Sequence, residues 1–414
     1  MKSFRMPIAA TAMVGVAALA VAVGGASAST HVAAHAAASS PFGAVHKATG
    51  TPYTFGLIND ETGQVTFPEA RQAEIAAADY VNEYMDGING HPIKLADCIG
   101  DGTAPTSARC ASELVAKKPL AILGAADSGT PGSEPVYERA GLDYLGGIPF
   151  TPVEQNAKNS IQFWSVSLGD NAAASVYAAK TLKAKTAVVL YFSNSQGEIA
   201  GLHIIPPVMK AAGITTVDTI GIPPTTPDPS PEVASAIADH PDVVYVDIPN
   251  NCGVVLKDLK SLGYSGKIVG IDPCTSPQAI ASAAGAAQGM YIASPFERSG
   301  SQFDLFLAAM KKFAAPNTAI DSIAEAGFAT VMNVRAGLDT VKGKPTSASI
   351  LKAFTSGSNH SNYMSHAYTC NGKAVAKAVS ICNDYYVIEQ IKGTAPVIAN
   401  PNNWITSKGY FKGL

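Results

Sequence analysis

The feature that most constrains the fold of this chain is a regular alternation of short apolar runs and longer amphipathic segments from Tyr53 onward. Short apolar runs are typical of buried strands, and an apolar period near 3.6 residues is typical of helices packed on a sheet. A repeated strand, helix, strand order predicts parallel sheets with helices on both faces, and the units suffice for two such sheets. The expected strands are Tyr53–Ile58, Ile93–Asp97, Leu120–Gly124, Ala187–Phe192, Val243–Ile248, Lys267–Asp272 and Met290–Ala293.

The N-terminal segment has the pattern of an export signal. Lys2 and Arg5 precede an apolar stretch over residues 6–23, and small residues follow as far as Ala28. This order is typical of a secretory signal peptide, so we expect residues 1–28 to be removed and the product to be secreted or periplasmic. No cysteine lies at the cleavage region, which argues against a lipoprotein. An uncleaved anchor is the alternative, because the stretch approaches the roughly 20 residues that span a bilayer.

The composition of the remaining chain limits the possible partners. Residues 29–50 are rich in Ala, Ser, Thr and His without sustained periodicity, so we interpret them as a flexible lead-in. The rest is long enough for two domains. A formal net charge of −3, without a basic stripe, argues against a nucleic-acid partner. No second long apolar run follows the leader.

The six cysteines favour local disulfides. Many pairings are possible in principle, but each cysteine has one near neighbour in the sequence. A zinc site is the alternative, although no C-x-x-C pair or Cys/His cluster supports it. Export to an oxidising compartment favours disulfides, each stabilising by about 3 kcal/mol in the chain-entropy model. The favoured pairs are Cys98–Cys110, Cys252–Cys274 and Cys370–Cys382.

Several segments, in order, resemble one known family. Residues 77–93 read AADYVNEYMDGINGHPI, a helix followed by a Gly-Ile-Asn-Gly turn into a strand. They resemble the first helix and turn of type I periplasmic binding proteins, the branched-chain amino-acid-binding (Leu/Ile/Val-binding protein-like) family of ABC importers. ILGAADS at 122–128, AVVLYF at 187–192 and AEAGF at 324–328 resemble later segments of that family. The likeness extends from Tyr53 to the C-terminal strands.

The resemblance implies a two-lobed α/β fold. Each lobe is expected to be a mostly parallel sheet flanked by helices, and three crossing strands form the hinge. The first lobe is then expected at residues 51–167 with 290–343. The second is expected at 168–289 with 344–414, with late strands between Tyr368 and Lys392.

The first lobe is expected to offer hydroxyls and amides to a ligand. In open parallel sheets, ligands lie outside the carboxyl ends of the strands, and the amides of helix starts suit a carboxylate. The resemblance implies that such groups hold the carboxylate of an amino acid. Capping of the next helix is an equally plain role for Ser128, and packing against the first helix is one for Phe67. The candidate contacts are Thr62, Phe67, Asp127, Ser128, Gly129, Thr130 and Thr151.

The second lobe offers Gln196, Asp247 and Asp272 after its strands. The family often has a tyrosine where Gln196 stands. A carboxylate near Asp272 matches the position that pairs with the ligand ammonium, and Asp247 is the alternative; helix capping is an equally plain role for both. Two acidic groups without an arginine favour a ligand with a cationic or hydrogen-donating part. A Cys252–Cys274 bridge is expected to stiffen this rim.

The motifs of common enzymes are missing from the sequence. It has no Gly-x-Ser-x-Gly elbow, no Walker or Gly-x-Gly-x-x-Gly loop, and no His-Glu-x-x-His. We therefore expect a monomeric binding protein without catalysis, cofactor or metal, which delivers an amino acid or related metabolite to an ABC permease. A sensor that reports the solute to a receptor is the first alternative. A secreted hydrolase with an unusual site is the second.

Overall fold

The structure is a computed structural model. None of the described helices is long and apolar enough to cross a bilayer. The expected leader, its cleavage site at Ala28 and most of the expected lead-in lie outside the described residues. The side chains of Ser195 and Gln196 also lie outside the description. The described residues are 41–166, 168–400 and 404–412.

The first lobe is built on a five-stranded sheet whose strands are all parallel, in the order β2-β1-β3-β4-β5. Its strands are β1 (Tyr53–Asp60), β2 (Ile93–Gly100), β3 (Ile122–Leu123), β4 (Tyr144–Leu145) and β5 (Ser160–Ile161). Its helices are α1 (Pro68–Tyr84), α2 (Ala104–Ala116), α3 (Thr130–Ala140), α4 (Pro152–Asn156), α11 (Gly300–Phe313), α12 (Ser322–Leu338) and α13 (Ser347–Thr355).

The second lobe is built on a seven-stranded sheet in the order β14-β13-β10-β9-β8-β6-β7. Five strands are parallel, and β13 and β14 continue the sheet in antiparallel pairing. The strands are β6 (Thr186–Phe192), β7 (Thr216–Ile222), β8 (Val243–Asp247), β9 (Lys267–Gly270), β10 (Tyr291–Ser294), β13 (Val387–Lys392) and β14 (Ala395–Ile398). The helices are α5 (Gly169–Lys180), α6 (Ser195–Glu198), a π-helical turn (Ile199–Ile204), α7 (Ile205–Ala212), α8 (Ser230–Ile237), α9 (Cys252–Ser261), a 3₁₀ turn (Asp272–Thr275) and α10 (Pro277–Ser282).

The chain passes between the two sheets three times: after β5, after β10 and before β13. The crossing segments are tied to their neighbours by single bridges, Gln162 with Ile381 and Phe296 with Ser365. A small hairpin of β11 (His360–Asn362) and β12 (Ser365–Tyr368) precedes the last crossing. The two-lobed α/β fold with three crossings is confirmed.

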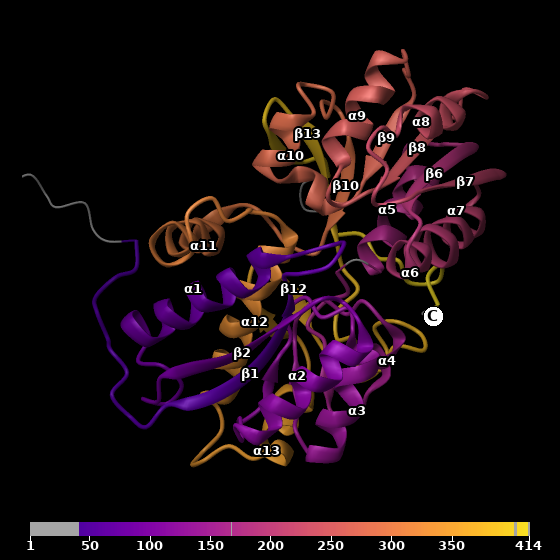
Figure 1. Cartoon of the computed structure of the whole chain (residues 1–414). Helices are drawn as coiled ribbons and strands as arrows, with labels where there is room; N and C mark the ends of the chain where they lie inside the picture. The colour runs from indigo at the N-terminus through magenta and orange to yellow at the C-terminus, as the bar shows by residue number, and fades with distance from the viewer. Residues whose placement is uncertain (1–40, 167, 401–403, 413–414) are drawn as a thin grey trace, which may run out of the picture. The chain divides into compact units, whose positions relative to one another are not determined.

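Close packing of α1 on α12 forms the centre of the first lobe (Figure 1). Small side chains let the two helices approach, because Ala70, Ala73, Ala77 and Val81 form the buried face of α1. A Cβ on Gly327 of α12 would lie 2.4 Å from the carbonyl oxygen of Ala70. A glycine is required at that contact, since real Cβ atoms do not approach a backbone oxygen so closely.

The lobe boundaries differ from the expected ones at two places. Strand β10 falls within 290–343, the segment expected in the first lobe, yet it pairs with β9 and β13 in the second sheet. Helix α13 falls within 344–414, yet its Ile350 and Phe354 join the hydrophobic core of the first lobe. The ring of Phe354 fits against Gly337 of α12, where a Cβ would lie 2.2 Å from it. Sequence order does not reveal such returns, because they depend on side-chain packing.

The expected lead-in spans residues 29–50, and its last residues pack on the fold. The amide of His46 donates to the carbonyl of Glu83 at 3.1 Å, and the amide of Ala48 donates to Asn82 at 2.9 Å. Ala48 is buried against this end of α1. The part of the lead-in from residue 42 to residue 50 is therefore bound along α1, because its backbone groups find partners there.

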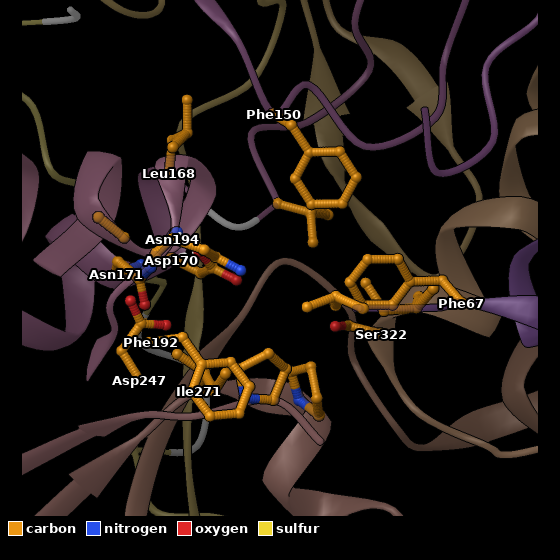
Figure 2. Close-up of a pocket in the computed structure, with 17 residues that line it drawn as sticks. Phe67, Phe150, Leu168, Asp170, Asn171, Phe192, Asn194, Asp247, Ile271 and Ser322 are labelled. Carbon is orange, nitrogen blue, oxygen red and sulfur yellow. Dashed lines mark hydrogen bonds between the residues drawn. The ribbon is translucent and has the colours of Figure 1, made fainter. Parts of the chain in front are cut away.

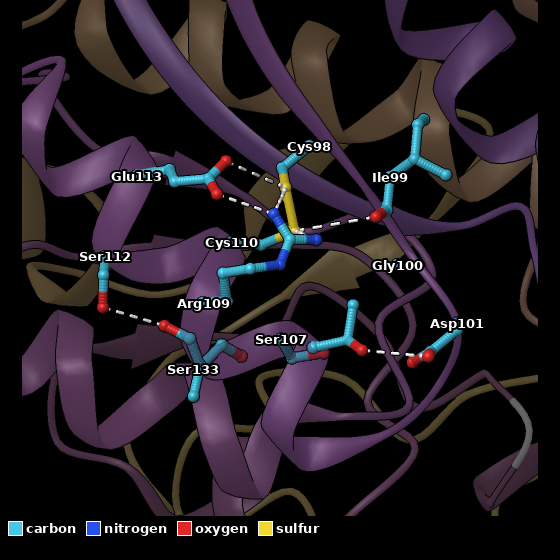
Figure 3. Close-up of a disulfide and its surroundings, with 12 residues drawn as sticks. Cys98, Ile99, Gly100, Asp101, Ser107, Arg109, Cys110, Ser112, Glu113 and Ser133 are labelled. Carbon is cyan, nitrogen blue, oxygen red and sulfur yellow. Dashed lines mark hydrogen bonds and ion pairs between the residues drawn. A yellow bond between two sulfur atoms is a disulfide. The ribbon is translucent and has the colours of Figure 1, made fainter.

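All three expected disulfides are confirmed. Cys98–Cys110 joins the end of β2 to α2, as Figure 3 shows. Cys252–Cys274 joins the segments that follow β8 and β9, which are neighbours in the sheet. The Cys252–Cys274 bridge therefore fixes the region just beyond two neighbouring strand ends.

Removing the first bridge tests its contribution to stability. We expect the double variant Cys98→Ser/Cys110→Ser to lose about 3 kcal/mol of unfolding free energy, because the unfolded chain regains the freedom of a closed loop. Urea denaturation under non-reducing conditions measures the loss. Ser112→Ala, an exposed change on α2, serves as the control. A double variant as stable as that control would contradict the expectation.

Candidate functional site

A pocket is lined by residues of both lobes (Figure 2). It lies where the carboxyl ends of the strands face helix starts, which is the usual ligand position in open parallel sheets. The first-lobe wall includes Val65, Phe67, Phe150, Val166, Ser322 and Ile323. The second-lobe wall includes Asp170, Asn171, Phe192, Asn194, Asp247 and Ile271.

The first-lobe wall is almost entirely apolar. Phe67 ends the loop after β1 and directly precedes α1, which begins with Pro68. Phe150 ends the loop after β4, directly before Thr151 and α4. The two rings stack with centroids 5.6 Å apart and an interplanar angle of 25°. This stacked pair provides a flat apolar surface that suits an aromatic or branched alkyl group.

Three neighbouring strands supply the second-lobe wall. Phe192 ends β6, Asp247 ends β8, and Ile271 directly follows β9. The start of α5 closes on the same strands, because the hydroxyl of Tyr245 on β8 donates to the Asn171 side chain at 2.7 Å. Asp247 is two residues after Tyr245, so both side chains lie on the face of the sheet that α5 covers.

Two buried polar atoms at the pocket lack partners. Neither Oδ2 of Asp247 nor Oγ of Ser322 has a hydrogen-bond partner within the described part of the chain. Asp247 is 7% exposed and Ser322 is fully buried. Burial raises the pKa of Asp247 to about 7. Unpartnered buried polar groups are costly, so a ligand that bonds to them gains their full hydrogen-bond energy.

Figure 2 shows the labelled aspartate and asparagine side chains gathered on one side of the pocket, whereas Phe67 and Ser322 lie across the space from them. Asp170 and Asn171 come from α5, Asn194 from the loop after β6, and Asp247 from β8. The acidic and amide side chains of the pocket therefore come from the second lobe, opposite the stacked phenylalanines of the first lobe.

Of the expected contact residues, Phe67 and Asp247 line this pocket. Gln196 lies between lining residues Asn194 and Gly197, but its side chain is outside the described residues. The structure does not bring the others to the pocket surface: Thr62, Asp127, Ser128, Gly129, Thr130, Thr151 and Asp272.

Internal carboxyl groups take the hydrogen-bond donors of the first rim. Asp60 accepts from the Ser128 amide at 2.8 Å and also from the Ser128 side chain. Asp127 accepts from the hydroxyls of Ser107 and Ser133 and from the Gly129 amide. These donors hold the protein's own loops together. The resemblance instead implied that they hold the carboxylate of a ligand.

The hydroxyl groups of the predicted threonine contacts are also bonded within the protein. Glu154 accepts from the hydroxyls of Thr130 and Thr151 and from the Thr151 amide. The hydroxyl of Thr62 donates to the carbonyl of Gly100 at 2.9 Å. Burial raises the pKa of Glu154 to about 8. Thr151 and Glu154 form a capping box that begins α4, which is the structural role of this cluster.

The backbone amides of the helix starts at the pocket also donate to groups of the protein itself. At α12, the Ser322 amide donates to Asp272 at 2.8 Å, and the next two amides donate to Asp321. At α5, the Asn171 amide donates to Asp170 at 2.8 Å. Exposed helix-start amides were the expected anion site. The structure differs because internal carboxylates already cap these amides.

Asp272 belongs to a buried ion-pair cluster around Arg298. The Arg298 guanidinium contacts both oxygens of Asp272 at 2.7 Å, Glu325 at 2.7 Å, and Glu389. Burial, only partly offset by Arg298, raises the pKa of Glu325 to about 7 and that of Glu389 to about 8. The expectation of a second rim without an arginine is therefore corrected. Arg298 lies in the segment between β10 and α11, far from Asp272 in the sequence, so residue order did not reveal the pair.

The pocket residues that the sequence analysis missed fall into two classes. Asn194 and Pro249 lie just beyond the ends of predicted strands, so extending those strand ends would have found them. Phe150 directly precedes the predicted contact Thr151, so including its neighbour would have found it. Asp170 and Ser322 are different, because they come from helix starts that follow crossings between the lobes. Only the tertiary structure places them at the pocket.

Replacing Arg298 tests the ion-pair cluster. We expect Arg298→Met to lose about 3–5 kcal/mol of unfolding free energy, because three buried carboxyl groups lose their cation. The loss should be greater at pH 8 than at pH 5, since carboxyl groups with a raised pKa are neutral at the lower pH. Urea denaturation at both values measures it.

Arg109→Met is the matched control for this variant. Arg109 forms an exposed ion pair with Glu113 one helical turn away, worth about 0.5 kcal/mol or less. Equal losses for the two variants, or a larger loss at pH 5, would contradict the role given to Arg298.

Comparison with known proteins places the chain in a family. A family model described as periplasmic binding protein matches residues 52–383, most of the chain. No curated protein matches the sequence. Among solved structures, leucine-binding protein LivK from Thermotoga maritima is 16% identical with a TM-score of 0.68, covering 84% of this chain and 98% of that one.

Two further structures are similar. LivJ from Streptococcus pneumoniae, in complex with isoleucine, is 15% identical with a TM-score of 0.69, covering 86% of this chain and 100% of that one. A solute-binding protein of an ABC transporter from Rhodopseudomonas palustris, in complex with 3,4-dihydroxybenzoic acid, is 18% identical with a TM-score of 0.69, covering 86% and 96%. At these identities the likeness establishes the fold. The chain belongs to the periplasmic binding protein family, has its type I two-lobed fold, and is a binding protein and not an enzyme.

Proposed function

We propose that this protein captures a small organic solute between its two lobes, outside the cytoplasmic membrane, and delivers it to an ABC importer. The observation that carries the proposal is the pocket whose walls come from both lobes and which contains the partnerless atoms of Asp247 and Ser322. A ligand that contacts both walls stabilises the arrangement in which they face each other. A permease can then distinguish the loaded protein from the empty one.

The similar proteins support this role. LivK and LivJ are named as leucine-binding and branched-chain amino acid transporter proteins, and the third structure is named as part of an ABC transporter. Their bound ligands differ, isoleucine in one and an aromatic acid in another. The family therefore supports solute capture, and the choice of solute depends on the pocket of each member.

A ligand panel tests solute capture. Amino acids, aromatic acids, amines and sugars are screened by thermal shift with residues 29–414, and each hit is titrated calorimetrically. We expect one class to raise the melting temperature, because binding only to the folded state stabilises it. The ligand should be recovered chemically unchanged. Turnover of the ligand, or the absence of any hit, would contradict the proposal.

The stacked phenylalanines locate the binding site. We expect Phe150→Ala to weaken the ligand found in the panel by about tenfold or more, because it removes half of the stacked pair. Phe313→Ala is the matched control, since Phe313 is half-buried in the same lobe but packs on Phe42. Calorimetry measures both. An equal effect of the two variants would place the ligand elsewhere.

Export is a separate part of the proposal. We propose that residues 1–28 direct secretion and are then removed, so that the mature protein begins at Ser29. Intact-mass measurement of the exported protein checks this, and a mutant with Ala26 and Ala28 both replaced by Leu is the control that should retain the leader. A wild-type protein that keeps all its N-terminal residues would instead indicate a membrane anchor.

A further inference from the structure

The charges at the pocket restrict the ligand it can hold. The described residues that line the pocket include no Lys, Arg or His, but they include the two acidic residues Asp170 and Asp247. Arg298 lies behind the wall, bonded to Asp272, and its guanidinium is fully engaged by three carboxyl groups. A ligand carboxylate in the pocket would therefore meet acidic groups without an available cation, which is strongly unfavourable in a buried site.

The backbone amides at the helix starts beside the pocket are already bonded within the protein. The amides at the start of α12 donate to Asp272 and Asp321, and the Asn171 amide at the start of α5 donates to Asp170. The Gly197 amide at α6 donates to the Asn194 side chain at 2.8 Å. These helix-start amides therefore have internal acceptors and are not available to a ligand carboxylate.

Asp247 requires a hydrogen-bond donor, and preferably a cationic one, from the ligand. Its Oδ2 is buried without a hydrogen-bond partner, and no cation lies among the described groups around it. An ammonium group donates up to three hydrogen bonds and neutralises the carboxylate, so it satisfies both needs at once. The partnerless Oγ of Ser322 on the facing wall can bond to a polar substituent elsewhere on the ligand.

The remaining walls fit the body of such a molecule. Phe67 and Phe150 stack on one side, and Phe192 and Ile271 lie at the strand ends on the other. Aromatic rings contact apolar groups well and also attract a nearby cation through their faces.

We propose that the solute is a primary amine with an aromatic or branched alkyl body and no carboxylate, whose ammonium group binds Asp247. This inference rests on the proposed function of the pocket. It differs from the amino acid that the resemblance implies, because the first-lobe hydroxyls and amides that were expected to hold its carboxylate are bonded to the protein's own carboxyl and carbonyl groups.

The affinity for the amine should depend on pH, because the buried carboxyl group of Asp247 must be ionised to bind it. The titratable groups beside Asp247 include Asp170 on α5, Tyr245 on β8 and Tyr191 at the paired position of β6. Burial raises the pKa of Asp247 to about 7, and a bound ammonium lowers it. The ionised form binds the amine, so affinity should fall as the pH drops from about 8 to about 6, with proton release on binding.

The test compares four molecules that share one phenyl body. They are 2-phenylethylamine, L-phenylalanine, 3-phenylpropanoate and 2-phenylethanol, titrated calorimetrically into the mature protein at about pH 6 and about pH 8. Isopentylamine and L-leucine form a matched alkyl pair. We expect each amine to bind at least about tenfold more tightly than its carboxylate-bearing counterpart and than the neutral alcohol.

Two variants assign the effect to one carboxyl group. Asp247→Asn should weaken amine binding by at least about tenfold while retaining the melting temperature of the unliganded protein. Asp218→Asn should leave the affinity unchanged, because it removes the same charge from an exposed position of the same sheet.

The outcomes separate this inference from the proposed function. Tighter binding of the amino acid, acid or alcohol would overturn the amine proposal, whereas solute capture would stand if Phe150→Ala weakened that ligand. Equal effects of the two aspartate variants would also overturn it, as would failure of both amines to bind. Solute capture itself fails only when the complete ligand panel yields no hit or a chemically altered ligand.

Discussion

The constraint on which the site depends is that buried carboxyl groups must find hydrogen-bond donors. They find them in the loops and helix starts beyond the strand ends, where Asp60, Asp127, Glu154, Asp272 and Asp321 all accept from backbone or hydroxyl groups. Each such group would be costly if left unpaired, so these contacts fix the loops before any ligand arrives. The pocket is therefore preorganised, and its free binding capacity is limited to the apolar walls and a few polar atoms.

Arg298 connects these hydrogen-bonded loops and helix starts to the segments that cross between the lobes. It follows β10, and its three carboxyl partners come from the turn after β9, from α12 and from β13. Asp272 also accepts the Ser322 amide at the pocket, so the cluster links the facing walls through one continuous set of hydrogen bonds. Its excess of acidic groups is tolerated because burial raises the pKa of Glu325 and Glu389 toward or above neutrality.

A disulfide restrains the second-lobe wall of the pocket. The Cys252–Cys274 bridge ties the segments after β8 and β9, which also carry Asp247 and Ile271. On the other wall, the tight contact at Gly327 fixes α12 against α1, and with it the position of Ser322. Both walls thus have little freedom to adapt, so specificity should depend on the charge and shape of the solute.

The sequence by itself determined the architecture. Apolar periodicity predicted seven strands that the structure contains, cysteine spacing indicated the three bridges, and ordered motifs identified the family, because these signals are local in the chain. Only the tertiary structure decided what the polar residues do. Ser128, Thr130 and Asp272 have the residue types of a ligand site, but they bond to partners distant in the sequence, such as Asp60, Glu154 and Arg298. Hydrogen bonding is satisfied in space, so the same hydroxyl or carboxylate serves a ligand or the fold according to its neighbours.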